Sequence, residues 1–111
     1  TQAERACWLA EELGHHYTTV GNLLTDMRRA KATIRKQEQL ARRWAFQYAV
    51  SFTGIIDAWD AGARSLHEMA DHLGIEESFL IEAFETYENV YGSFVITGDT
   101  MITFSPVSVL R

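Results

Sequence analysis

The sequence predicts a mainly α, α+β fold with about five helices and a C-terminal β-hairpin. Apolar residues recur at spacings of three and four through most of the chain, the period of helices that bury one face. Only residues 92–111 are rich in β-forming residue types. No linker or repeat interrupts the 111 residues, so residues 1–111 are expected to form a single domain.

Capping residues and breakers set the limits of the predicted helices. Ser65 and Glu68 have the spacing of a capping box, and Gly74 stands where a left-handed residue ends a helix. Residues 18–33 are polar and basic and include Gly21, so a loop or a frayed turn is expected there. The predicted helices cover residues 2–17, 33–51, 53–61, 65–73 and 76–91.

Three of the predicted helices carry an apolar stripe that is expected to face the core. The stripe of the first helix consists of Ala6, Leu9, Ala10, Leu13 and Tyr17. The stripe of the second consists of Ile34, Ala41, Trp44, Ala45 and Tyr48. The stripe of the fifth consists of Phe79, Leu80, Ala83, Phe84 and Tyr87.

The C-terminal segment has the pattern of a β-hairpin. Residues 94–97 and 101–104 are β-formers, and a Gly-Asp-Thr turn separates them. Pro106 follows directly, and a proline cannot donate a ladder hydrogen bond. The pairing is therefore predicted to end with the hairpin.

Charge and composition exclude several classes of partner. The net charge is −5, and residues 51–111 hold ten Asp/Glu but only two Lys/Arg. Such an acidic half repels phosphates, so nucleic acid is not expected as a partner. No apolar run approaches the roughly 20 residues of a membrane span, and residues 1–10 lack the basic start and apolar stretch expected of a signal peptide. Cys7 is the single cysteine, which excludes an internal disulfide and favours a cytoplasmic location.

The residues best suited to metal binding and catalysis lie on the first predicted helix, around Glu11. Glu11 and His15 are four residues apart, so both side chains can reach one metal ion from the same helix face. Glu12 lies one position round the helix. The His-Glu-x-x-His helix of zinc peptidases uses this arrangement, with two ligands one turn apart and a glutamate as general base. The pattern predicts a zinc site with Glu11 and His15 as ligands and Glu12 as the catalytic base.

Glu38 on the second predicted helix is the candidate for a third ligand. It borders the apolar stripe beside Ala41 and Ala45, whose small side chains allow another helix to approach. A carboxylate at such a boundary needs a partner, because burying an unpaired charge is costly. A metal ion shared with His15 is one such partner, and Arg35 or Arg42 is another. For the motif helix, the alternative is a solvated charged face without metal.

Two runs of the sequence resemble the ImmA/IrrE family of metallopeptidases. Residues 7–19, with the core Glu11-Glu12-Leu13-Gly14-His15, resemble the zincin-like metal-binding helix of that family. Residues 38–45 resemble its second signature, a glutamate followed by small and aromatic residues. Residues 65–75 and 87–92 resemble the helical tail of its phage and conjugative-element members.

The resemblance implies a zinc-dependent endopeptidase that cleaves a helix-turn-helix repressor and thereby derepresses a prophage or mobile element. It makes His15 the second ligand of the motif helix, Glu12 the general base and Glu38 the downstream acidic ligand. Glu11 stands in the first-ligand position, where the family usually has a histidine. The family also has a helix and short strands before the motif helix, so a truncated or processed chain is expected.

Two other functions compete with the peptidase. A non-catalytic interaction domain derived from the same family would keep the motif helix but bind its protein partner without metal. DNA binding is suggested by the helix-turn-helix outline of residues 65–91. The second helix of that outline carries five glutamates and no Lys or Arg, which disfavours contact with phosphates.

Overall fold

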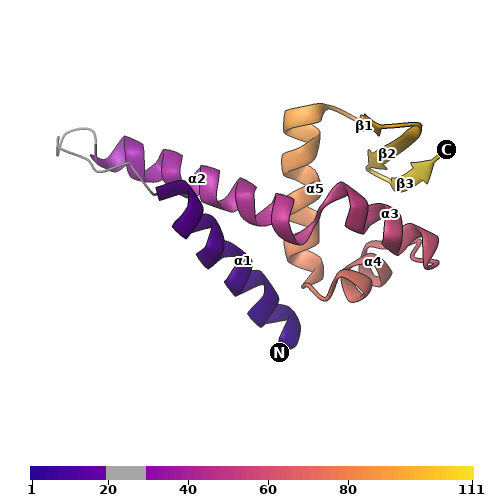
Figure 1. The fold of residues 1–111 in the computed structure, drawn as a ribbon, viewed down its shortest axis with the longest axis horizontal. Coiled ribbons are helices and arrows are strands. Elements are labelled where there is room, and N and C mark those ends of the chain that lie inside the picture. Colours follow the sequence, from indigo (N-terminus) through magenta and orange to yellow (C-terminus); the bar gives the residue numbers. More distant parts are fainter. Residues whose placement is uncertain (20–29) are drawn as a thin grey trace.

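The computed structural model describes the backbone of residues 1–19 and 30–111, and the side chains of residues 1–16 and 35–111. Within these residues, five helices precede a three-stranded antiparallel sheet (Figure 1). The predicted mainly α fold with C-terminal β structure is therefore confirmed. The elements are α1 (Gln2–Thr19), α2 (Ala30–Ala49), α3 (Phe52–Asp60), α4 (Leu66–Leu73), α5 (Glu77–Tyr91), β1 (Phe94–Thr97), β2 (Thr100–Phe104) and β3 (Val107–Leu110).

The first two helices are longer than predicted. Residues 18–19 belong to α1 and residues 30–33 belong to α2, so both ends of the predicted loop are helical. The expected break at Gly21 lies outside the described residues.

Serine side chains begin two of the later helices. Ser51 Oγ accepts a hydrogen bond from the Gly54 amide at 3.0 Å, and Ser65 Oγ accepts one from the Glu68 amide at 3.1 Å. Both bonds satisfy amides that have no partner within the helix. Gly74, with φ of 71°, ends α4 in the left-handed conformation. The predicted start and end of α4 are thus confirmed.

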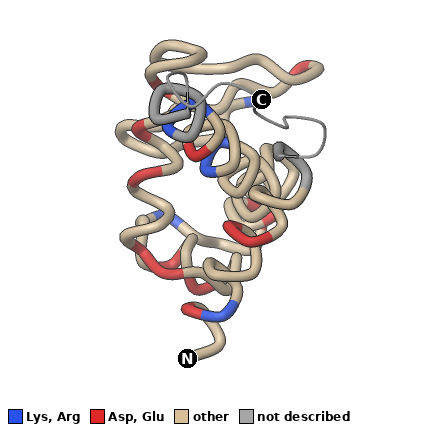
Figure 2. Tube along the Cα trace, turned by 90° about the vertical axis from the view of Figure 1, so that its left-hand side faces the viewer, with Lys and Arg blue, Asp and Glu red and all other residues tan. Residues whose placement is uncertain are grey.

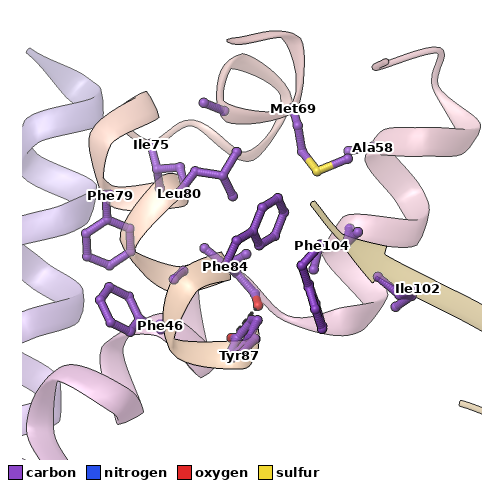
Figure 3. Close-up of a cluster of buried hydrophobic side chains, with 14 of the residues drawn as sticks. Phe46, Ala58, Met69, Ile75, Phe79, Leu80, Phe84, Tyr87, Ile102 and Phe104 are labelled. Carbon is purple, nitrogen blue, oxygen red and sulfur yellow. Dashed lines mark hydrogen bonds between the residues drawn. The ribbon is translucent and has the colours of Figure 1, made fainter. Parts of the chain in front are cut away.

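Helix α5 stands between the α1–α2 pair on one side and α3, α4 and the sheet on the other (Figure 1). All five residues of its predicted stripe are buried. Figure 3 shows how its aromatic residues meet those of other elements: the Phe79 ring lies against Phe46 of α2, with centroids 5.0 Å apart. Tyr87 packs against Phe104 of β2, with centroids 5.6 Å apart. The core is therefore organised around one helix that touches both halves of the molecule.

The sheet contains one strand more than the sequence predicts. β2 lies between β1 and β3, and Ile102 pairs with Val95 on one side and Val109 on the other. The prediction that Pro106 ends the pairing is wrong, because Pro106 lies in the turn between β2 and β3 and has no ladder hydrogen bond to donate. The Thr103 hydroxyl donates to the Pro106 carbonyl at 2.7 Å and supports that turn.

Small residues mediate the contact between α1 and α2. Ala10 and Gly14 of α1 are buried, as are Ala41 and Ala45 of α2. A Cβ atom placed on Gly14 would lie 2.2 Å from the Ala41 carbonyl oxygen, which is far inside van der Waals contact. The two backbones can approach this closely only because position 14 has no side chain.

The predicted stripes of α1 and α2 are partly wrong. Leu9 is 48% exposed and Tyr48 is 58% exposed. Ala10 of the α1 stripe is buried as predicted, but Cys7 in α1 and Phe46 in α2, which lie outside the predicted stripes, are buried as well. The contact favours small side chains over large ones, so residue size decides which face of each helix turns inwards.

The Gly14 contact predicts that Gly14→Ala lowers the free energy of unfolding by about 2 kcal/mol, the usual cost of overpacking a dense contact. At an open helical position the same substitution would raise the free energy of unfolding by about 1 kcal/mol. The sign of the measured change therefore shows whether position 14 is a close backbone contact. Urea denaturation followed by circular dichroism measures the difference. Gly54→Ala is the control, because a Cβ there meets only side-chain atoms, Leu73 Cδ2 and the capping Ser51 Oγ, each at 3.1 Å, and should cost less than a clash with backbone.

Tyr87 provides a second test of the core. Its buried hydroxyl donates to the Val50 carbonyl at 2.7 Å, and burial raises the pKa of this phenol. Tyr87→Phe should cost about 1.5 kcal/mol by leaving the carbonyl without its partner. Above about pH 10 an unfolded tyrosine ionises while folded Tyr87 keeps its proton, so stability falls as pH rises. Urea midpoints at pH 8 and 10.5 should show a shallower alkaline loss in the variant, and an unchanged slope would contradict this account.

Candidate metal centre

The three predicted metal ligands line one hollow. Glu11 and His15 reach it from α1, and Glu38 and Arg42 reach it from α2. The volume of the hollow is about 210 Å³. The sequence therefore identified three of its four lining residues, which come from two helices.

The small-residue contact explains why these side chains share one side of the helix pair. Ala10 and Gly14 face α2, and the next position round the helix in each case carries Glu11 or His15. On α2, Ala41 and Ala45 face α1. Glu38, three residues before Ala41, and Arg42, directly after it, lie beside these alanines on the helix surface. Because one turn separates members of each pair, the four side chains border the same seam.

Arg42 is the central charge of this region. Its Nη1 atom donates to Glu11 Oε1 at 3.0 Å, and its Nη2 atom pairs with the Glu82 carboxylate of α5. Its guanidinium also lies 5.3 Å from the centroid of the Phe46 ring. One side chain thus connects α1, α2 and α5.

Glu38 differs from the expectation built on its position. It is exposed, so the predicted need for a partner against burial does not arise. Among the described residues Glu38 forms no ion pair within 4.0 Å, and Arg42 pairs with Glu11 and Glu82 instead. The structure places Glu38 at the hollow but leaves its carboxylate in solvent.

The donor types at the hollow fit zinc, which accepts imidazole nitrogen and carboxylate oxygen. Their present arrangement does not amount to a closed ligand set. Among the side chains of residues 1–16 and 35–111, no three His, Cys, Asp or Glu converge to hold a metal ion. Glu11 is engaged by Arg42, whereas His15 and Glu38 are exposed. A metal ion at Glu11 would therefore share this carboxylate with Arg42 or displace it, and would need the exposed His15 and Glu38 side chains to converge on it.

The predicted base, Glu12, lies beside this hollow without lining it. It is exposed on α1, one position beyond Glu11. A carboxylate there is open to water, as a proton acceptor must be. Trp8, on the same helix, is 62% exposed, and Cys7 is packed in the core.

A larger groove, which the sequence did not reveal, adjoins the hollow at Arg42. It runs between α2 and α5, with a volume of about 460 Å³. Only the ordinary amphipathic pattern marks these helix positions in the sequence, and no motif spans both helices. The groove is lined by Gln39, Arg42, Arg43, Phe46, Glu82, Glu85, Thr86, Asn89 and Val90.

Comparison with protein-family models, curated proteins and solved structures gave no match for this chain. No helix of the described residues is long and apolar enough to cross a membrane. Acidic positions occur at many separate places along the chain (Figure 2).

The exposure of the Arg42 pairs predicts how much they stabilise the fold. The side chains of Arg42, Glu11 and Glu82 are 45%, 37% and 48% exposed, so solvent screens both ion pairs. Arg42→Gln should lower the free energy of unfolding by less than about 1 kcal/mol at 0.15 M salt. Urea denaturation tests this, with Arg35→Gln as a control on the same helix. A loss above about 2 kcal/mol would show that Arg42 is a main support of the fold.

Proposed function

We propose that the chain is a zinc-dependent endopeptidase-like protein of the ImmA/IrrE type, with its metal centre in the α1–α2 hollow. One observation carries the proposal: Glu11, His15 and Glu38, selected from sequence pattern and resemblance, line the same hollow. The proposed substrate is a helix-turn-helix repressor. The proposed compartment is the cytoplasm, where a single reduced cysteine such as Cys7 is ordinary.

Each residue has a separate role in this proposal. Bound zinc supplies a Lewis acid that polarises a peptide carbonyl and makes water more acidic. His15 provides the neutral nitrogen donor, and Glu11 and Glu38 provide anionic oxygen donors. Glu12 accepts a proton from the attacking water and passes it to the leaving amine. Because Glu11 offers a carboxylate in place of a neutral imidazole, the centre would carry more negative charge, and zinc held there would be a weaker Lewis acid than at a two-histidine site.

Arg42 competes with the metal for Glu11. Its guanidinium is a cation held by the same carboxylate that zinc would use. Glu82 offers Arg42 a second carboxylate on α5, so the side chain keeps a partner after releasing Glu11. In this proposal zinc at Glu11 would compete with the Arg42 cation for the same carboxylate.

A non-catalytic interaction domain is the second candidate, and the Arg42–Glu11 pair favours it. That pair satisfies the carboxylate in the first-ligand position without any metal. In this alternative the helix keeps its packing role through Gly14, while the hollow serves only as part of a binding surface.

Zinc binding distinguishes the two candidates. Calorimetry with zinc alone should show one site per chain, and chelator should lower the melting temperature of the zinc-loaded protein. His15→Ala should weaken binding at least tenfold, whereas the adjacent His16→Ala should leave it nearly unchanged. Arg42→Gln should strengthen binding because Glu11 loses its competing cation. Absence of zinc from the supplemented protein, with no effect of chelator, would favour the non-catalytic domain.

Cleavage tests the assignment of Glu12. A quenched fluorescent peptide library is the probe, and hydrolysis by the zinc-loaded chain is the readout. Glu12→Gln should reduce hydrolysis at least about 100-fold, the usual contribution of a general base, while zinc affinity is retained. Glu4→Gln on the same helix is the matched control. Hydrolysis that survives Glu12→Gln would remove Glu12 from the mechanism.

A further inference from the structure

The groove between α2 and α5 is lined by polar side chains and by two apolar ones, Phe46 and Val90. Val90, which is 44% exposed, supplies apolar surface, whereas Phe46 is 2% exposed and offers only a small part of its ring. Its volume of about 460 Å³ falls within the range of ligand sites, roughly 300–1,000 Å³. Arg42 belongs both to this groove and to the smaller hollow of Glu11 and His15. The two depressions are therefore neighbours on one surface.

Several polar groups on the walls of the groove have no partner within the part of the chain that the structure describes. Arg42 is paired with Glu82, but Arg43 on α2 and Glu85 on α5 form no ion pair there. Gln39 on α2 and Asn89 on α5 form no side-chain hydrogen bond there. Each amide offers two donors and an acceptor, which matches the N–H and C=O groups of a polypeptide backbone.

We propose that this groove binds an extended segment of a protein substrate, next to the bond that is cleaved. The inference rests on the proposed peptidase function for its link to cleavage, but the groove itself needs no metal. The amides of Gln39 and Asn89 suit main-chain groups, the exposed Val90 side chain suits an apolar side chain, and the glutamates on the α5 wall repel phosphates. These features together select a peptide rather than a nucleic acid.

The unpaired charges specify which peptide. The α2 wall carries the unpaired Arg43, and the α5 wall carries the unpaired Glu85. Successive side chains of an extended segment point to opposite sides. Two neighbouring residues of the bound segment, one acidic and one basic, therefore meet Arg43 and Glu85 respectively. The segment recognised is an acidic–basic dipeptide flanked by an apolar residue.

Fluorescence anisotropy with labelled nonapeptides tests the proposal on the whole chain in the presence of EDTA. The probes carry a central Glu-Lys, Lys-Glu or Gln-Gln pair in an otherwise identical Ser/Leu sequence. We expect one of the charged orders to bind at least fivefold more tightly than Gln-Gln. Arg43→Ala should weaken that peptide about threefold without affecting Gln-Gln, as expected for a solvent-exposed pair. Arg5→Ala, on α1 and outside the groove, is the matched control.

A charge exchange provides the sharper test. In the double variant Arg43→Glu with Glu85→Arg, the positive wall becomes negative and the negative wall positive. The preferred order of the two charged residues should reverse, from Glu-Lys to Lys-Glu or the opposite. Both positions are exposed and unpaired among the described residues, so the exchange should leave the melting temperature unchanged.

Clear outcomes would overturn the inference. The inference is overturned if charged and uncharged peptides bind with equal affinity or if none of them binds. It is also overturned if Arg43→Ala and Arg5→Ala have equal effects. Amide chemical-shift changes on peptide addition must map to α2 and α5, and changes confined to the sheet would also overturn it. Because EDTA removes metal, peptide binding without zinc binding would reject the peptidase and keep the groove. Zinc binding without peptide binding would reject the peptide groove and leave the proposed zinc site standing.

Discussion

The contact between Gly14 and the Ala41 backbone is the constraint on which the arrangement of α1 depends. A side chain at position 14 would collide with the Ala41 carbonyl oxygen, so the two helices can meet here only through small residues. This close approach has a consequence for chemistry as well as for packing. It places Glu11 and His15 on one border of the seam and Glu38 and Arg42 on the same border of the partner helix. Separating the helices by one methyl group would widen the hollow that these four residues line.

Arg42 links the α1–α2 pair to α5. Its pairs with Glu11 and Glu82 join α1 to α5 across α2. Solvent limits the stability of such exposed pairs, so packing rather than charge holds the helices together. The more important effect of Arg42 is positional. It borders both the hollow and the groove, and a single rotation of its side chain changes the charge available at Glu11. A ligand that moved Arg42 at one depression would therefore change the charge at the other.

Sequence patterns predicted the fold correctly where the contacts between distant segments favour the same structure as the local sequence does. The stripe of α5 is apolar in sequence and buried in the structure, because this helix contacts elements on both sides (Figure 3). Ser65 and Gly74 delimit α4 through hydrogen bonding and backbone conformation that need only neighbouring residues. By contrast, Leu9 and Tyr48 have the right spacing for burial and remain exposed. Periodicity identifies faces of a helix, but it does not say which of two adjacent faces will meet a partner that admits only small side chains.

The candidate site and the sheet also show which features local sequence predicts and which depend on contacts between distant segments. Helical spacing places Glu11 beside His15, and the position of Glu38 at the edge of an apolar stripe adds a third candidate ligand, so sequence alone determined the candidate residues and the chemistry they suggest. Only the tertiary structure decided that Arg42 takes the Glu11 carboxylate, because that pairing depends on how α2 crosses α1 and α5. It also decided that the chain continues past Pro106 into β3, since a proline in a turn costs no ladder hydrogen bond. Local sequence determines helices, caps and spacing within a helix, whereas contacts between distant segments determine which charges meet.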